Sequence, residues 1–154
     1  MYQGRKAESF FAAGGTAGMT WALRADLAIR HVYPEKPVVA VSGDGGFMMA
    51  VQALSTAVQY DIPVTCVVMN DSSLGMVRQH QGERVIASEF SEIDHAALAK
   101  SFGAEGLQVT DSKDLPEALR YAQTAGRPFV LDVVTDRTAS PDDYRAVPRG
   151  STET

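Results

Sequence analysis

Apolar residues along this chain follow two spacings, one typical of helices and one typical of buried strands. Short, nearly continuous apolar runs predict strands at 36–42, 64–69, 106–110 and 128–134. A strand that is covered on both faces needs no alternation of polar and apolar residues. Elsewhere apolar residues recur every three or four positions, and this period predicts helices at 16–32, 47–60, 91–102 and 112–125.

Local signals mark several ends of these elements. Pro34 ends the first helix, and Ser91 and Asp94 have the spacing of a capping box at the start of the third. Pro116 falls in the first turn of the last helix, where a missing N–H costs little, and Gly126 is a plausible C-cap. The polar stretch 70–90 carries no predicted element.

Alternating helices and continuous apolar strands predict an α/β fold. We expect a three-layer, doubly wound sheet that is mainly parallel, with helices on both faces and right-handed crossovers. Ligands of such sheets bind beyond the carboxyl ends of the strands. The positions to search for chemistry therefore follow Ser42, Met69, Thr110 and Val134.

The length of 154 residues suits one domain, and an apolar content of 45% suffices for one core. We expect this domain to span 13–138. It would lie between an irregular N-terminal segment, 1–12, and an irregular C-terminal tail, 139–154, that is rich in Pro, Ser and charge.

Charge and cysteine content narrow the function classes. With 14 basic and 19 acidic residues the net charge is −5, which disfavours nucleic-acid binding. A single cysteine, Cys66, excludes an intrachain disulfide and a cysteine zinc site, and we expect it in the core. No apolar run approaches the roughly 18 residues of a membrane span, and the start lacks a signal peptide. We therefore expect a soluble, cytoplasmic protein with no membrane contact.

The first predicted strand runs into a glycine-rich segment, Gly43-Asp44-Gly45-Gly46, and then into a helix. Glycines allow close approach of the backbone to a ligand, and a helix start attracts phosphate. Asp44 would repel a bare phosphate, so we expect Mg²⁺ between them. A plain strand-to-helix turn is the alternative. The segment is neither a dinucleotide fingerprint, since Met48 replaces its last glycine, nor a P-loop, since the lysine is missing.

The second strand ends in Asn70-Asp71, which lie 26 and 27 residues after Asp44. If the two strands are neighbours, Asp44 and Asp71 could hold one cation from two sides. Ordinary turn chemistry explains Asn-Asp-Ser-Ser equally well when it is taken alone. His31, His80 and His95 lie far apart in sequence, and we expect each to face solvent.

Together the two segments resemble the diphosphate–metal motif of thiamine-diphosphate enzymes. The stretch VAVSGDGGFMMAVQALSTAVQYDIPVTCVVMNDSSLGMVRQHQ is similar to the diphosphate-binding (C-terminal TPP-binding) domain of one group of them. That group comprises acetolactate synthase, benzoylformate decarboxylase and the sulfopyruvate decarboxylase β subunit. The similarity runs from about Ala13 to about Val134, which is most of the chain.

The resemblance implies thiamine diphosphate and Mg²⁺ as cofactors. The metal ligands would be Asp44, Asp71, where the family has Asn, and the backbone carbonyl of Ser73. An aspartate keeps the oxygen ligand that Mg²⁺ prefers. The implied cofactor-binding positions are Gly15, Ala17, Gly18, Met19, Gly43, Asp44, Gly45, Gly46, Asn70, Asp71, Ser73, Leu74, Gly75 and Met76.

Upstream, Ala13 to Leu23 resembles the family segment in which a large apolar residue wedges under the cofactor and bends it. Met19 takes the wedge position, and the carbonyl of Ala17 would accept from the 4′-amino group. Ala17 replaces a family glycine, and Arg24 replaces a family proline. Met19 could instead be an ordinary core residue. Leu74 and Met76 could line the thiazolium or substrate side, or serve only in packing.

The family's activating glutamate lies on a separate pyrimidine-binding domain, for which this chain has no room. Glu8, Glu35 and Glu83 match no such motif, so no catalytic residue is assigned here. The chain is expected to be one subunit of a decarboxylase or carboligase for a small 2-oxo acid, inactive alone. A pyrimidine-binding chain would complete a hetero-oligomer such as α2β2. We expect a natural subunit, since the sequence begins with Met1.

Other interpretations stay open: a fragment of a longer enzyme, or a non-catalytic cofactor-binding or assembly protein. The second of these predicts loss of cofactor residues, yet Met19, Asp44, Gly45 and Gly46 are present. A 2-oxo acid:ferredoxin oxidoreductase chain would normally bring more cysteines than Cys66. A transketolase-type domain fits the residues around Gly-Asp-Gly less well.

Overall fold

The computed structural model describes residues 9–139. Its helices are α1 (Trp21–Val32), α2 (Asp44–Ala50), α3 (Ala53–Gln59), α4 (Gly75–Gln81), α5 (His95–Ser101) and α6 (Leu115–Thr124). Its strands are β1 (Val39–Gly43), β2 (Thr65–Asn70), β3 (Glu105–Val109) and β4 (Phe129–Val134). Residues 1–8 and 140–154, on which parts of the predicted terminal segments fall, lie outside the described residues.

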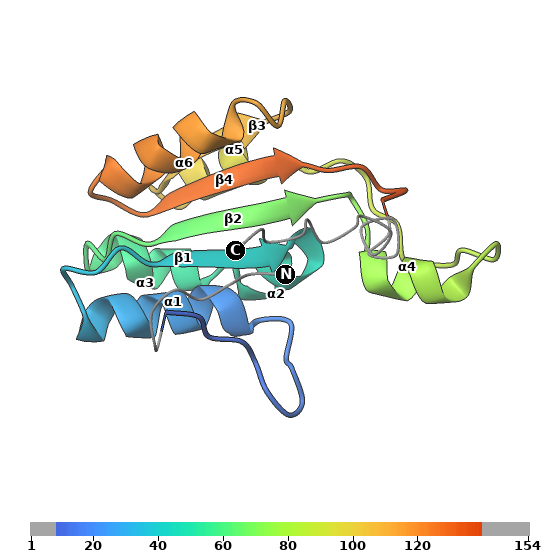
Figure 1. Cartoon of the computed structure of the whole chain (residues 1–154), viewed down its shortest axis with the longest axis horizontal. Helices are drawn as coiled ribbons and strands as arrows, with labels where there is room; N and C mark the ends of the chain where they lie inside the picture. The colour runs from blue at the N-terminus through green and yellow to red at the C-terminus, as the bar shows by residue number, and fades with distance from the viewer. Residues whose placement is uncertain (1–8, 140–154) are drawn as a thin grey trace, which may run out of the picture.

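The strands form one parallel sheet in the order β1-β2-β4-β3. β1 and β2 are neighbours, with Ser42 opposite Val68 and Gly43 opposite Met69. This confirms the pairing on which the two-sided cation site depends. The carboxyl ends of the strands point to one edge of the sheet, and α4 lies beyond that edge (Figure 1).

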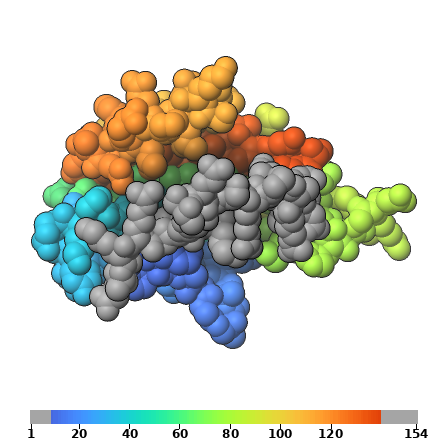
Figure 2. Space-filling view, in the orientation of Figure 1, coloured from blue at the N-terminus to red at the C-terminus, as the bar shows by residue number. Residues whose placement is uncertain are grey.

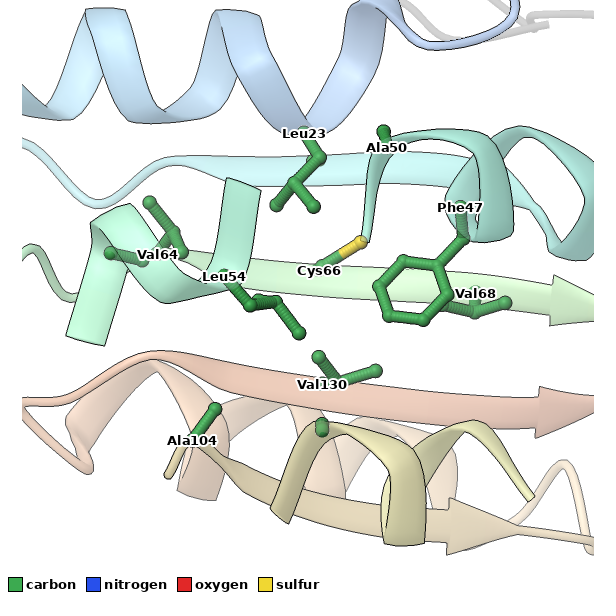
Figure 3. Close-up of a cluster of buried hydrophobic side chains, with 12 residues drawn as sticks. Leu23, Phe47, Ala50, Leu54, Val64, Cys66, Val68, Ala104 and Val130 are labelled. Atoms are coloured by element: carbon green, nitrogen blue, oxygen red, sulfur yellow. The ribbon is translucent and has the colours of Figure 1, made fainter. Parts of the chain in front are cut away.

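Helices cover both faces of the sheet, as the α/β prediction requires. The larger core packs α1, α2, α3 and α5 on one face, through residues such as Leu23, Phe47 and Leu54 against Cys66 (Figure 3). Among residues 9–139, the helix that packs on the other face is α6, through Ala118 and Ala122. Cys66 is fully buried, as expected, and burial raises the pKa of its thiol.

The predicted helix 47–60 is two helices. α2 begins earlier, at Asp44, and ends at Ala50, while α3 begins at Ala53. Between them the hydrogen bonds tighten to a three-residue spacing, from Leu54 N to Val51 O and from Ser55 N to Gln52 O. The Ser55 hydroxyl also donates to the Gln52 carbonyl at 2.7 Å, which competes with the regular helical pattern.

Two other local predictions need correction. The polar stretch 70–90 contains α4, which has no buried residue and so no apolar period to detect. The capping-box prediction was wrong because the N-cap of α5 is Asp94 and not Ser91. The Asp94 carboxylate accepts from Ala97 N at 2.7 Å. Pro116 does lie in the first turn of α6, and Gly126 follows that helix with a φ of 68°.

Within the part of the chain that the structure describes, no helix has the length and apolar character that crossing a membrane requires.

Candidate functional site

Asp44 stands at the junction of β1 and α2, at the carboxyl edge of the sheet. It is only 3% exposed. One carboxylate oxygen, Oδ1, accepts from Gly45 N at 2.6 Å, and the other, Oδ2, accepts from Ser73 N at 3.2 Å. Burial raises the pKa of Asp44 above its ordinary value, and the charge of Asp71 raises it further. The site therefore disfavours a lone negative charge on Asp44.

Asp71 approaches the same point from the end of β2. Its Oδ1 accepts from Ser73 N at 3.0 Å, so one backbone amide serves both carboxylates. The Ser73 hydroxyl is buried with no hydrogen-bond partner. Two carboxylates and an unpartnered oxygen gathered in this way form the oxygen-rich donor set that Mg²⁺ prefers. The residues present thus fit the metal that the sequence implied.

The glycines after Asp44 are needed because other side chains lie close to them. A Cβ on Gly45 would come within 2.6 Å of Leu74 Cδ2 and 3.4 Å of Met19 Cε. A Cβ on Gly46 would lie 2.7 Å from the Met19 carbonyl oxygen. Met19 and Leu74 are thereby brought against the Gly-Asp-Gly segment, as the resemblance implied. Met19 is 51% exposed, so it is not an ordinary core residue.

Gly75 completes this cluster, because a Cβ there would lie 2.5 Å from Asp71 Oδ2. Met76 is on the exposed surface of α4, which stands out from the body of the molecule (Figure 2). The other predicted upstream positions lie on the loop before α1. An added Cβ at Gly15 or Gly18 would meet nothing within 4 Å, so at these two positions the described residues leave open space, whereas Met19 of the same loop contacts the Gly-Asp-Gly segment.

Asn70 points inward instead of toward the open edge. Its amide nitrogen donates to Asp132 Oδ1 at 2.8 Å, and its carbonyl oxygen accepts from Ser72 N at 3.2 Å. Asp132, on β4, is fully buried, and the sequence analysis missed it. A single carboxylate inside the apolar run Pro128–Val134 was the signal that could have revealed it.

A second residue that the sequence analysis missed holds the same loop from outside. The Arg137 guanidinium donates to the carbonyl of Asp71 at 2.8 Å and to that of Ser72 at 3.3 Å. Glu89 lies 3.7 Å from Arg137 and 2.7 Å from Arg78. Hydrogen bonding by Arg78 is the main cause of the lowered pKa of Glu89.

The three histidines divide into two groups. His31 and His80 are exposed, as predicted, but the prediction for His95 was wrong: it is 1% exposed. Its ring packs edge-to-face on Phe47, with 5.5 Å between centroids, and its Nδ1 has no partner. It is the first residue of α5, next to the capping Asp94.

Comparison with known proteins decides the family. The model of the family "Thiamine pyrophosphate enzyme, C-terminal TPP binding domain" matches residues 1–133. This chain belongs to that family. It is the thiamine-diphosphate-binding domain of acetolactate-synthase-like enzymes, and the match includes the segment 1–12 that was predicted to lie outside the domain.

Relatives and a solved structure agree with this assignment. The acetolactate synthase of Bacillus subtilis (strain 168) is 40% identical over 121 residues, which cover 77% of this chain and 20% of that protein. The acetolactate synthase isozyme 3 large subunit of Escherichia coli (strain K12) is 36% identical over 116 residues, 71% of this chain and 20% of that one.

The solved structure is the thiamine diphosphate-dependent 4-hydroxybenzoylformate decarboxylase of Rhodococcus jostii RHA1. Its TM-score is 0.74 at 26% identity, over 79% of this chain and 24% of that one. This chain thus spans only about a fifth to a quarter of the length of these proteins.

Proposed function

We propose that this chain is the diphosphate- and Mg²⁺-binding subunit of a thiamine-diphosphate-dependent decarboxylase or carboligase acting on a small 2-oxo acid. The observation that carries the proposal is the convergence of Asp44 and Asp71 on the amide of Ser73. Two carboxylates held this close favour a divalent cation between them and the diphosphate. The similarity to acetolactate synthases and to a 2-oxo acid decarboxylase supports the substrate class.

In this proposal each residue has one task. Asp44, Asp71 and the Ser73 carbonyl hold Mg²⁺; among the described residues no hydrogen bond occupies that carbonyl. The backbone of Gly45 and Gly46 lies at the diphosphate. Met19 and Leu74, which press on Gly45, shape the apolar side of the pocket. When bound, thiamine diphosphate supplies the carbon nucleophile and the electron sink for the reaction.

The site needs a second component. Glu35 and Glu83 are both exposed, and Glu35 lines a hollow with Arg30 and Pro37 at the amino ends of β1 and β2, away from Asp44. Neither makes a described contact with Asp44 or Asp71, so neither supports the role of the activating glutamate that the resemblance implies. We therefore propose a pyrimidine-binding partner chain that supplies it, in a hetero-oligomer such as α2β2.

Calorimetry of the purified chain tests cofactor binding. We expect thiamine diphosphate to bind with Mg²⁺ present and not in EDTA. Binding that ignores the metal would contradict the metal assignment, and no binding at all would favour a non-catalytic role or a site formed only with the partner.

Native mass spectrometry of the tagged chain from its own host tests the partner. A stoichiometric second chain of similar size supports the split enzyme. A homo-oligomer without such a chain, or a longer polypeptide containing this domain, would overturn the two-chain proposal.

A further inference from the structure

The buried carboxylate of Asp132 joins the end of β2, next to the proposed metal site, to two elements farther along the chain. Its Oδ1 accepts from the Asn70 amide at 2.8 Å, and its Oδ2 accepts from His95 N at 3.1 Å and from the Gln108 amide at 3.1 Å. These donors come from the end of β2, the start of α5 and β3. No other described side chain links these three elements by hydrogen bonds.

Asp132 sets the orientation of the Asn70 amide. Because the carboxylate is an acceptor only, it requires the NH₂ group of Asn70 to face it, and the Ile93 carbonyl accepts from the same NH₂ at 3.2 Å. The Asn70 oxygen then points the other way and accepts from Ser72 N at 3.2 Å. This is an Asx turn, and it holds Ser72 at a φ of 54°, a conformation that a serine seldom adopts.

The Asx turn in turn places the amide of Ser73, the group that both Asp44 and Asp71 contact. We propose that Asp132 is a positioning residue for the metal-binding loop and acts through Asn70. The inference rests on the proposed function for its consequence in metal binding. The orientation of the loop itself can be measured without any ligand.

An Asp132→Asn variant breaks this chain of contacts for a definite reason. The backbone N–H of His95 cannot be reversed, so the oxygen of the new amide must face it, and the new NH₂ must face Asn70. Asn70 then has to flip, which turns its own NH₂ toward Ser72 N and destroys the Asx turn. We expect amide exchange at Ser72 and Ser73 to accelerate by about tenfold or more, measured by NMR without ligand. Exchange of Val67 and Val68 within β2 should not change.

Gln108→Ala is the matched control, since it removes a donor to Asp132 but does not touch Asn70. In this variant the backbone amides of Ser72 and Ser73 should exchange at the wild-type rate. The double variant Asn70→Asp with Asp132→Asn keeps the total charge and restores both bonds, because the new amide can donate to the new carboxylate, which still accepts from Ser72 N. We expect loop protection to return in part, because a carboxylate oxygen at position 70 cannot donate to the Ile93 carbonyl and faces that acceptor instead.

Mn²⁺ titration followed by electron paramagnetic resonance connects the loop to the metal. Asp132→Asn should weaken Mn²⁺ binding by about tenfold or more, and the double variant should recover most of it. If the wild type binds no Mn²⁺, the proposed metal site fails, whereas the exchange rates still decide the role of Asp132. Unchanged exchange in Asp132→Asn, or an unprotected loop in a folded double variant, overturns the inference.

A measurement on the wild type covers variants that do not fold. The side-chain amide protons of Asn70 should exchange much more slowly than those of the exposed Gln59, because Asp132 and Ile93 hold them. Equally fast exchange of the two side chains would overturn the inference.

Discussion

Asp44 and Asp71, which belong to different strand ends, accept hydrogen bonds from the same backbone amide, that of Ser73, at 3.2 and 3.0 Å. Two carboxylates that share one donor repel each other, and the repulsion contributes to the raised pKa of Asp44. A divalent cation removes this repulsion. The two positions lie 27 residues apart because Asp44 follows β1 and Asp71 follows β2. These strands are parallel neighbours, which a helical crossover must connect.

Asp44→Ala should abolish Mg²⁺-dependent binding of thiamine diphosphate and leave the fold intact. The substitution removes a metal ligand and the acceptor of Gly45 N. It also removes a buried charge and its repulsion with Asp71, which offsets the lost hydrogen bond, so we expect little loss of thermal stability. Calorimetry measures the binding, and circular dichroism with thermal melting measures the fold. An affinity equal to that of the wild type would show that the metal lies elsewhere.

Asp71→Asn should be tolerated. Asparagine keeps an oxygen for Ser73 N and for the metal, and it relieves the repulsion on Asp44, although it gives up one charge toward Mg²⁺. We expect the affinity for thiamine diphosphate to stay within about tenfold of the wild type, or 1.4 kcal/mol. Titration of both proteins at one Mg²⁺ concentration checks this. A far larger loss would argue against placing Asp71 at the family's asparagine position.

The sequence predicts β2 and β4 well because burial on both faces leaves a continuous apolar run, whereas the edge strands β1 and β3 bury only some of their residues. The same logic placed Asp44 and Asp71 together, since parallel neighbours end at one edge. α4 escaped prediction because none of its residues is buried. No local pattern marks a helix that packs so little of its surface.

The supporting contacts could not be predicted because they depend on pairs far apart in sequence. Asn70 meets Asp132 across 62 residues, and Arg137 reaches Asp71 across 66. His95 was predicted to face solvent because, like His31 and His80, it has no other histidine near it in sequence. Its burial depends on Phe47, which the fold alone brings beside it.

Ala17→Gly should stabilise the protein. Ala17 has a φ of 45°, in the left-handed region that costs an L-residue about 1 kcal/mol. Glycine avoids that cost, partly offset by its greater freedom in the unfolded chain, so we expect a gain of roughly 0.5 kcal/mol in the free energy of unfolding. Ala13→Gly, on the same loop without a positive φ, is the control and should give no gain. Urea denaturation of the three proteins compares them, and a loss at Ala17 would show that the turn relaxes in solution.

Asp26 makes the stability of the protein depend on pH. It lies in α1, is 2% exposed, and neither carboxylate oxygen has a hydrogen-bond partner. Burial raises its pKa to about 7. The nearby Ala40 N–H, which does not reach hydrogen-bond geometry, and the charge of Arg30 lower it only in part. The unfolded chain ionises near 3.8 and the folded protein only near 7. The contribution of protonated Asp26 to the free energy of unfolding is therefore full below pH 3.8 and is lost as the pH rises to about 7.

Asp26→Asn should remove this dependence. Between pH 4 and 7 the wild-type free energy of unfolding should fall by on the order of 1–4 kcal/mol through this group and then level off. In Asp26→Asn that component of the slope should vanish. Asp114→Asn, at an exposed carboxylate without a side-chain cap bond, is the matched control and should keep the wild-type slope. Urea denaturation across the pH range separates these cases. If the slope in Asp26→Asn is as steep as in the control, then Asp26 ionises in the folded protein as it does in the unfolded chain. Water would then reach its carboxylate, either directly or through a movement of α1.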